Sequence, residues 1–155
     1  MIDMSDLLRL DAVAIDFGAS SKKSLFQMLA GFIAPQLELD PRLVVERLSD
    51  RERLGSTGFG HGVAIPHARV QGLAQITGGF VRLAQPVEYH AVDDLPVDLV
   101  FLLLSPVDAG AEHLKALARV SRTLRDARFL DKLRGAASRD ALYALFTTDE
   151  ARDAA

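Results

Sequence analysis

The feature that most constrains the fold is an unbroken run of six apolar residues, Leu99 to Leu104. The run is far shorter than the roughly 20 residues that a membrane-spanning helix needs. It is typical of a β-strand that is buried on both of its faces. Such a strand needs a covering layer on each side of its sheet. We therefore predict that Val97–Leu104 is a central strand.

Patterns typical of helices and strands lie on both sides of this segment. Serines 20 and 21 predict the start of one helix, and Asp40-Pro41 predicts the start of a second, which Gly55 ends. Further strands are predicted at 12–17, 63–65 and 77–83, and further helical pieces at 109–124, 129–133 and 140–146. This mixture predicts a single α/β domain with three layers, α/β/α, in which a mixed sheet is flanked by helices.

Composition limits the chemistry and the partners. The 155 residues fit one domain, and the formal net charge of -3 gives no general attraction to nucleic acid or to an anionic membrane. The chain has no cysteine, which excludes disulfides, thiolate metal sites and cysteine nucleophiles. The N-terminus lacks the pattern of a signal peptide. We expect a cytoplasmic protein without membrane insertion.

A cluster of glycines marks the segment that we expect to carry the function. Four of the 11 glycines fall within eight residues: Gly55, Gly58, Gly60 and Gly62. Glycines let backbone N–H groups approach a ligand closely, and successive N–H groups form an anion-binding nest, so a phosphate is the candidate ligand. The alternative is a mobile turn between a helix and a strand.

Several known motifs do not fit this segment. A phosphate-binding P-loop would have lysine directly after Gly60, where His61 stands, and the dinucleotide fingerprint would have glycine in place of Val63. His61 and His67 lack the HExxH arrangement and have no cysteine partner, so a zinc site is not favoured. We expect neither a metal nor a cofactor.

His67 is the candidate nucleophile. A neutral imidazole nitrogen attacks electrophiles at pH 7. Pro66 keeps Ile65 extended and has no N–H for a sheet ladder, which favours a strand end or edge where the imidazole faces solvent. For an isolated histidine a structural role is the alternative.

The segment from Gly55 to His67, Gly-Ser-Thr-Gly-Phe-Gly-His-Gly-Val-Ala-Ile-Pro-His, resembles the phosphorylation-site motif of IIA proteins of the phosphotransferase system. The group is the type-2 EIIA domain of the fructose, mannitol and nitrogen-regulatory systems. The resemblance continues through Pro96-Val-Asp-Leu-Val-Phe-Leu-Leu and Glu112-His-Leu-Lys-Ala-Leu and covers residues 5–148, which leaves 149–155 as a frayed tail. Within the group, the stand-alone nitrogen-regulatory (PtsN-like) type is the most similar in length.

This resemblance implies that His67 accepts a phosphoryl group, with His113 and Arg51 beside it. Because a phosphorylated side chain carries roughly -1.5 to -2 charges, N–H and guanidinium donors would stabilise it. Without the resemblance, His113 would be a solvated residue on a helix, and Arg51 would form a surface ion pair with Glu52 or Asp50. The residues that we expect to bind the phosphate through hydroxyls or backbone amides are Ser56, Thr57, Gly58 and Gly60.

The resemblance also implies the partners. We expect a phosphotransferase-type phosphocarrier that forms a phosphohistidine and takes the group from a small carrier of the HPr type or from its nitrogen-branch counterpart, NPr. In the regulatory reading, which we favour, the phosphorylation state governs binding to target proteins. In the first alternative the group passes to a IIB domain for sugar uptake, and in the second the chain is an interaction module that has lost phosphotransfer. We expect a shallow, exposed depression with an apolar rim that includes Phe59.

Overall fold

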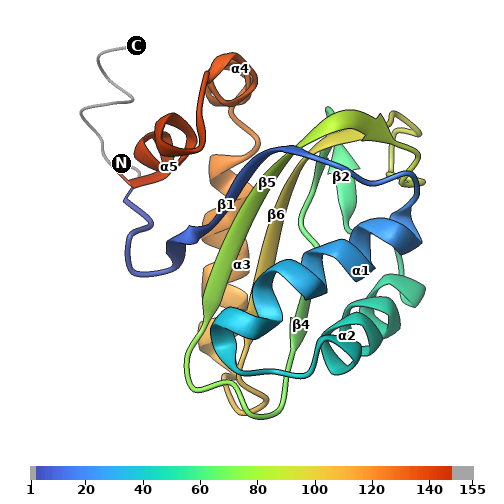
Figure 1. Cartoon of the computed structure of the whole chain (residues 1–155), viewed down its shortest axis with the longest axis vertical. Helices are drawn as coiled ribbons and strands as arrows, with labels where there is room; N and C mark the ends of the chain where they lie inside the picture. Colours follow the sequence, from blue (N-terminus) through green and yellow to red (C-terminus); the bar gives the residue numbers. More distant parts are fainter. Residues whose placement is uncertain (1–2, 148–155) are drawn as a thin grey trace.

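The computed structural model describes residues 3–147, and the predicted tail at 149–155 lies outside them. A mixed sheet of six strands has helices on both faces, as the three-layer α/β prediction requires (Figure 1). The strands are β1 (Leu8–Phe17), β2 (Gly58–Gly60), β3 (Val63–Ala64), β4 (His67–Arg69), β5 (Thr77–Val87) and β6 (Val97–Ser105). The helices are α1 (Lys22–Ile33), α2 (Pro41–Arg53), α3 (Ala111–Thr123), α4 (Ala127–Gly135) and α5 (Arg139–Thr147), and the 3-10 helix η1 (Ala34–Leu37) follows α1.

Strand β6 lies at the centre of the sheet. The strand order is β1-β5-β6-β3-β2, and β4 also pairs with β6. Strand β5 runs antiparallel to β6, whereas β3 and β4 run parallel to it. The side chains of β6 alternate between two cores, since Leu102 and Leu104 belong to one and Phe101 and Leu103 to the other. The prediction of a strand buried on both faces is confirmed.

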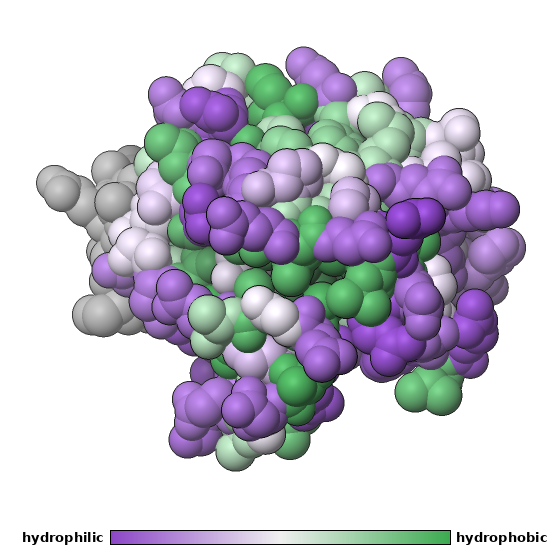
Figure 2. Space-filling view, turned by 60° about the horizontal axis from the view of Figure 1, so that its bottom comes forward, coloured by the Kyte–Doolittle hydropathy of each residue, from purple (hydrophilic) through white to green (hydrophobic). Residues whose placement is uncertain are grey.

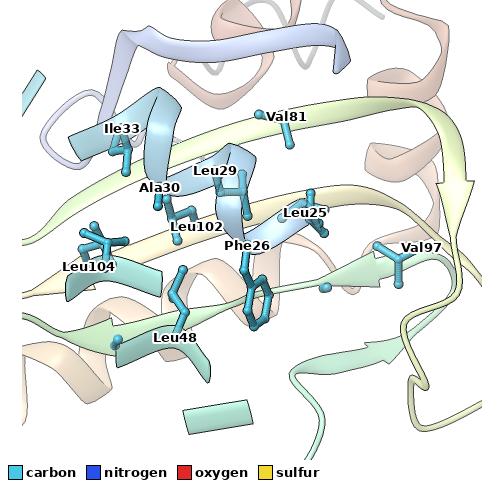
Figure 3. Packing of buried hydrophobic residues seen from close by; sticks show 14 of the residues in the cluster. Leu25, Phe26, Leu29, Ala30, Ile33, Leu48, Val81, Val97, Leu102 and Leu104 are labelled. Atoms are coloured by element: carbon cyan, nitrogen blue, oxygen red, sulfur yellow. The ribbon is translucent and has the colours of Figure 1, made fainter. Parts of the chain in front are cut away.

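The two cores separate the helices into two layers. Helices α1 and α2 cover one face, where Leu25, Leu29 and Leu48 pack against Leu102 and Leu104 (Figure 3). Helices α3, α4 and α5 cover the other face. There, Val120, Phe129 and Phe146 pack with the opposite side of β6. Burial on both faces fixes the register of β6, because a slip of one residue would exchange its two faces.

The predicted helix starts are confirmed. Ser21 is the N-cap of α1 and forms a capping box with Ser24. The Asp40 side chain accepts a hydrogen bond from the backbone N–H of Arg42 at the start of α2. Helix α2 ends at Arg53, and Gly55 follows with a positive φ of 149°.

The strand predicted at 63–65 is one residue shorter in the structure, and a second short strand continues its line after a break. Strand β3 ends at Ala64, and β4 begins at His67 in the same register on β6: Ala64 pairs with Val100, and His67 pairs with Leu103. Ile65 and Pro66 therefore interrupt one line of pairing. Strands β2 and β4 have three residues each, which is too short for a periodic pattern, and the sequence does not predict them.

The helix predicted at 109–124 is present as α3, but its first leucine, Leu114, does not face the core. Its apolar spacing places Leu114 on the buried face, but Leu114 is 62% exposed, whereas His113 is only 4% exposed. The first turn of α3 extends past the apolar core and reaches a surface depression. The inward-facing residue of this turn is therefore the polar His113 and not a leucine. None of the helices within residues 3–147 is long and apolar enough to span a membrane.

The close approach at Gly58 generates a stability prediction. A Cβ atom at Gly58 would lie 2.8 Å from both Ala91 Cβ and Tyr89 Cδ1. We expect Gly58→Ala to lower the free energy of unfolding by about 1–3 kcal/mol through overpacking. A Cβ atom at Gly31, inside α1, would meet nothing within 4 Å, so Gly31→Ala should raise the free energy of unfolding by about 0.5–1 kcal/mol. Urea denaturation measures both, and a neutral Gly58→Ala would refute the packing role.

Candidate functional site

Two contacts define the protonation of His67. Its Nδ1 lies 2.7 Å from the carbonyl oxygen of Ile65. Because a carbonyl only accepts hydrogen bonds, Nδ1 carries the proton. Its Nε2 lies 3.2 Å from Nε of Arg51, which donates, so Nε2 holds a lone pair. The neutral imidazole therefore presents Nε2 as its basic and nucleophilic atom.

The direction of the Ile65 backbone groups makes the first of these contacts available. The Pro66 carbonyl accepts from Leu103 of β6, whereas the Ile65 N–H donates to Thr57 on the other side. Since the N–H and C=O groups of one strand residue point the same way, the Ile65 carbonyl also faces away from β6. It is thus free to accept the proton of the His67 ring two residues later. His67 lies at the start of β4, as the prediction of a strand end or edge requires. Its side chain does not face open solvent, because the residue is only 8% exposed.

Arg51 lies in the last turn of α2 and is held at two points. Its Nε donates to His67, and its Nη1 donates to the Gly55 carbonyl at 2.9 Å. The alternative surface ion pairs are made by other residues: Asp50 pairs with Arg47 and Arg53. The guanidinium of Arg51 is directed at the imidazole.

His113 lies in the first turn of α3 and is not a solvated surface residue. Its ring centroid is 5.7 Å from that of His67, with an angle of 44° between the ring planes. Its Nδ1 lies 2.6 Å from Oγ of Ser105, the last residue of β6. The structure thus brings together His67, Arg51 and His113 from three separate elements.

The three side chains line a surface depression of about 480 Å³. Apolar residues border it, of which Leu54 is 84% exposed and Leu114 is 62% exposed. On the face shown in Figure 2, hydrophobic residues gather in the middle and hydrophilic residues surround them. Phe59 does not line the depression and packs instead against the core under α3, α4 and α5.

The four residues expected to bind phosphate do not line this depression. Gly58 and Gly60 belong to β2, and the N–H of Gly58 donates to Oγ of Ser56. The hydroxyl of Thr57 is buried and lies 2.7 Å from the Tyr89 hydroxyl. Their phosphate-binding role stays a prediction, and in the structure of this chain their polar groups hold the loop after α2.

Glu52 has a structural role in this region that the sequence did not predict. Its carboxylate accepts from the Thr57 hydroxyl at 2.6 Å, from the Thr57 N–H at 3.1 Å and from Lys22 Nζ at 2.9 Å. Burial raises the pKa of Glu52, but these hydrogen bonds outweigh it and hold the pKa below its ordinary value. Lys22 is 30 residues away from Glu52 in the sequence, so no local pattern predicts this pairing. The network fixes the loop that contains Gly55, which in turn holds Arg51.

The environment keeps both histidines neutral. Burial is the main cause that lowers the pKa of His67, and the charge of Arg51 adds to it. Burial also lowers the pKa of His113, to about 4, with further contributions from Arg69 and His67. Within residues 3–147, no group of three or more histidine or acidic side chains is placed to hold a metal ion.

Comparison with known proteins defines the class. Residues 6–148 match the family described as the phosphoenolpyruvate-dependent sugar phosphotransferase system, EIIA 2. The chain belongs to this family, whose members are phosphocarriers of a phosphotransferase system.

Several relatives lie in the nitrogen-regulatory branch. The chain is 44% identical over 142 residues to the nitrogen regulatory protein of Bradyrhizobium diazoefficiens, covering 92% of this chain and 93% of the relative. The crystal structure of nitrogen regulatory protein IIA-Ntr from Neisseria meningitidis has a TM-score of 0.86 at 37% identity, covering 92% and 97% of the two chains. The fructose-specific EIIA component of Haloferax volcanii is 30% identical over 138 residues, covering 88% and 90%. All three likenesses confirm the predicted family, and the two nitrogen regulatory proteins confirm its PtsN-like branch.

The neutral His113 leads to a pH prediction. An unfolded histidine has a pKa near 6.5, whereas the folded value is about 4, so the unfolded chain binds more protons between these values. The free energy of unfolding therefore falls as the pH drops through this window. Between pH 7 and pH 5 we expect His113 to contribute about 1–2 kcal/mol of this loss.

The measurement is urea denaturation at both pH values on wild type and His113→Gln. A glutamine at position 113 does not titrate. Between pH 7 and pH 5 the free energy of unfolding of the variant should therefore fall by about 1–2 kcal/mol less than that of wild type, whatever the variant's stability at pH 7. An equal loss in both proteins would contradict the assignment.

Proposed function

We propose that this chain accepts a phosphoryl group on Nε2 of His67 from the phosphohistidine of an HPr-type or NPr-type carrier. The observation that carries the proposal is the pair of contacts that place the proton on Nδ1 and the lone pair on Nε2. A nucleophile must present a lone pair, and Nε2 is the ring nitrogen that does so. We place the domain at residues 5–148 and the protein in the cytoplasm.

The transfer step follows from the contacts of His67. The bond between phosphorus and the donor nitrogen breaks while a bond between phosphorus and His67 Nε2 forms, with the two nitrogens in line. The donor ring keeps the electron pair of the broken bond. The His67 ring becomes more positive, and the Ile65 carbonyl stabilises the Nδ1 proton that it already accepts. The proton stays on Nδ1 throughout this step.

Arg51 has two tasks in this scheme. In the resting protein its Nε–H caps the Nε2 lone pair at 3.2 Å, so the guanidinium must shift when phosphorus approaches. Its N–H groups then face phosphoryl oxygens, with which a guanidinium forms charge-assisted hydrogen bonds. The hydrogen bond from Arg51 Nη1 to the Gly55 carbonyl keeps the guanidinium beside the His67 ring.

A carrier must also release the group. Binding the phosphohistidine too tightly would deepen a ground state and slow onward transfer. Arg47, which also lines the depression, pairs with Glu46 and Asp50 and is partly neutralised. Arg69 also lines the depression, but the arginine that hydrogen-bonds to the imidazole is Arg51, and this single contact supports reversible transfer.

The rim supports docking of a carrier protein. His67 is mostly covered, yet it lines an open depression beside the exposed Leu54 and Leu114. Exposed apolar side chains around a polar centre are typical of protein interfaces. A protein partner that presents its phosphohistidine at this depression would bury both leucines.

We favour a regulatory role, in which the phosphorylation state governs binding to target proteins. The likeness to nitrogen regulatory proteins at up to 44% identity supports it. Transfer to a IIB domain in sugar uptake is the alternative that the fructose-specific relative supports. Growth of a deletion strain on candidate sugars separates the two, because a defect on one sugar only would contradict regulation.

Labelling with phosphoenolpyruvate, enzyme I and the carrier tests the proposed acceptor. We expect acid-labile phosphate on wild type and none on His67→Ala, a loss of at least about 100-fold, because the variant lacks the nucleophile.

The matched control is His90→Asn, at an exposed histidine outside the depression. His90 has a positive φ, which asparagine tolerates. This control should be labelled as wild type is. Label that persists on His67→Ala would remove the site, and a wild type that stays unlabelled with cognate partners would favour an interaction module.

A further inference from the structure

A buried serine lies behind the second histidine of the site. Ser105, the last residue of β6, is fully buried, and its Oγ lies 2.6 Å from Nδ1 of His113. Among the described residues 3–147, this ring nitrogen is the one hydrogen-bond partner of the Ser105 hydroxyl. Neither the resemblance to the family nor the patterns of the sequence pointed to this residue.

Proton counting decides the direction of this bond. If His113 Nδ1–H donated to Oγ, the hydroxyl proton of Ser105 would be buried without an acceptor, which is costly. If Oγ–H donates to Nδ1, the buried proton has its acceptor and Nδ1 supplies a lone pair. The second arrangement leaves the single ring proton of neutral His113 on Nε2.

We propose that Ser105 is a positioning residue that holds His113 as its Nε2–H tautomer, so that this N–H donates to a phosphoryl group on His67. The proposal rests on the proposed function for its second half alone. The two histidines then have opposite tautomers: His67 presents a lone pair at Nε2, and His113 presents a proton at Nε2.

Burial and ring orientation support this assignment. His113 lines the depression, and its Nδ1 is turned to the buried serine, so the edge that carries Nε2 is left for the depression. The low pKa of His113 keeps the ring neutral at pH 7. A neutral ring has one N–H, and the atom that carries it decides whether His113 donates to the phosphate or repels it with a lone pair.

Long-range ¹H–¹⁵N spectra of the imidazoles test the tautomer without any phosphotransfer. In wild type we expect the His113 Nδ1 shift of an unprotonated nitrogen and the Nε2 shift of a protonated one. In Ser105→Ala the Nδ1–H form should appear. A protonated Nδ1 in wild type, or the same tautomer populations in both proteins, would overturn the proposal.

The rate of phosphoryl transfer to His67 tests the second half of the proposal, that the His113 Nε2–H donates to the phosphoryl group. We expect Ser105→Ala to lower this rate about 3- to 10-fold, which is the effect of one lost neutral hydrogen bond, while the final extent of labelling is unchanged. An unchanged rate would overturn the role in transfer. If wild type itself takes no label, the proposed function fails, whereas the spectra still decide the tautomer.

A neighbouring hydroxyl provides the matched control. Thr77 is buried on β5 and pairs with Leu104, next to Ser105, but its hydroxyl donates to the Gln75 carbonyl. Thr77→Val removes a hydroxyl of similar burial and keeps the shape. It should leave the His113 spectrum and the transfer rate as in wild type, and a change equal to that of Ser105→Ala would show a general effect of packing.

Discussion

The hydrogen bond from His67 Nδ1 to the Ile65 carbonyl is the contact on which the site depends. It exists because the Ile65 carbonyl faces away from β6, towards Thr57, whose backbone N–H donates to Glu52 and leaves that carbonyl without a strand partner. This one backbone carbonyl thus fixes the ring, places its proton on Nδ1 and leaves the lone pair on Nε2, which faces Arg51. The central strand β6 supports this arrangement, because its pairing with β3 and β4 holds both sides of the break.

Buried polar groups around the site act as supports for the side chains that face the depression. Glu52 ties Thr57 and Lys22 together and fixes the loop whose Gly55 carbonyl holds Arg51. Ser105 has the corresponding place behind His113. Each polar group is costly to bury alone and is stabilised by its partners, so the supports are also part of the folded structure.

Much of the fold followed from local patterns. The apolar run at Leu99–Leu104 predicted the central strand, and Asp40-Pro41 predicted a helix start, because burial and capping depend on neighbouring residues. The site was predicted less completely. A three-residue strand such as β4 has no detectable period, and the pairing of Glu52 with Lys22 depends on how α1 and α2 pack. The phosphate-binding role of Gly58 stays a prediction, whereas the need for a glycine beside Tyr89 and Ala91 became visible only in the packed structure.

The central claim is that the structure presents Nε2 of His67, and not Nδ1, to the incoming phosphoryl group. The most direct test is the ¹⁵N–³¹P coupling in protein labelled with ¹⁵N-histidine and phosphorylated by its carrier. Coupling of phosphorus to Nε2 of His67, with Nδ1 still protonated, is the result that the two contacts of the ring predict. Coupling to Nδ1, or to a nitrogen of His113, would contradict the account.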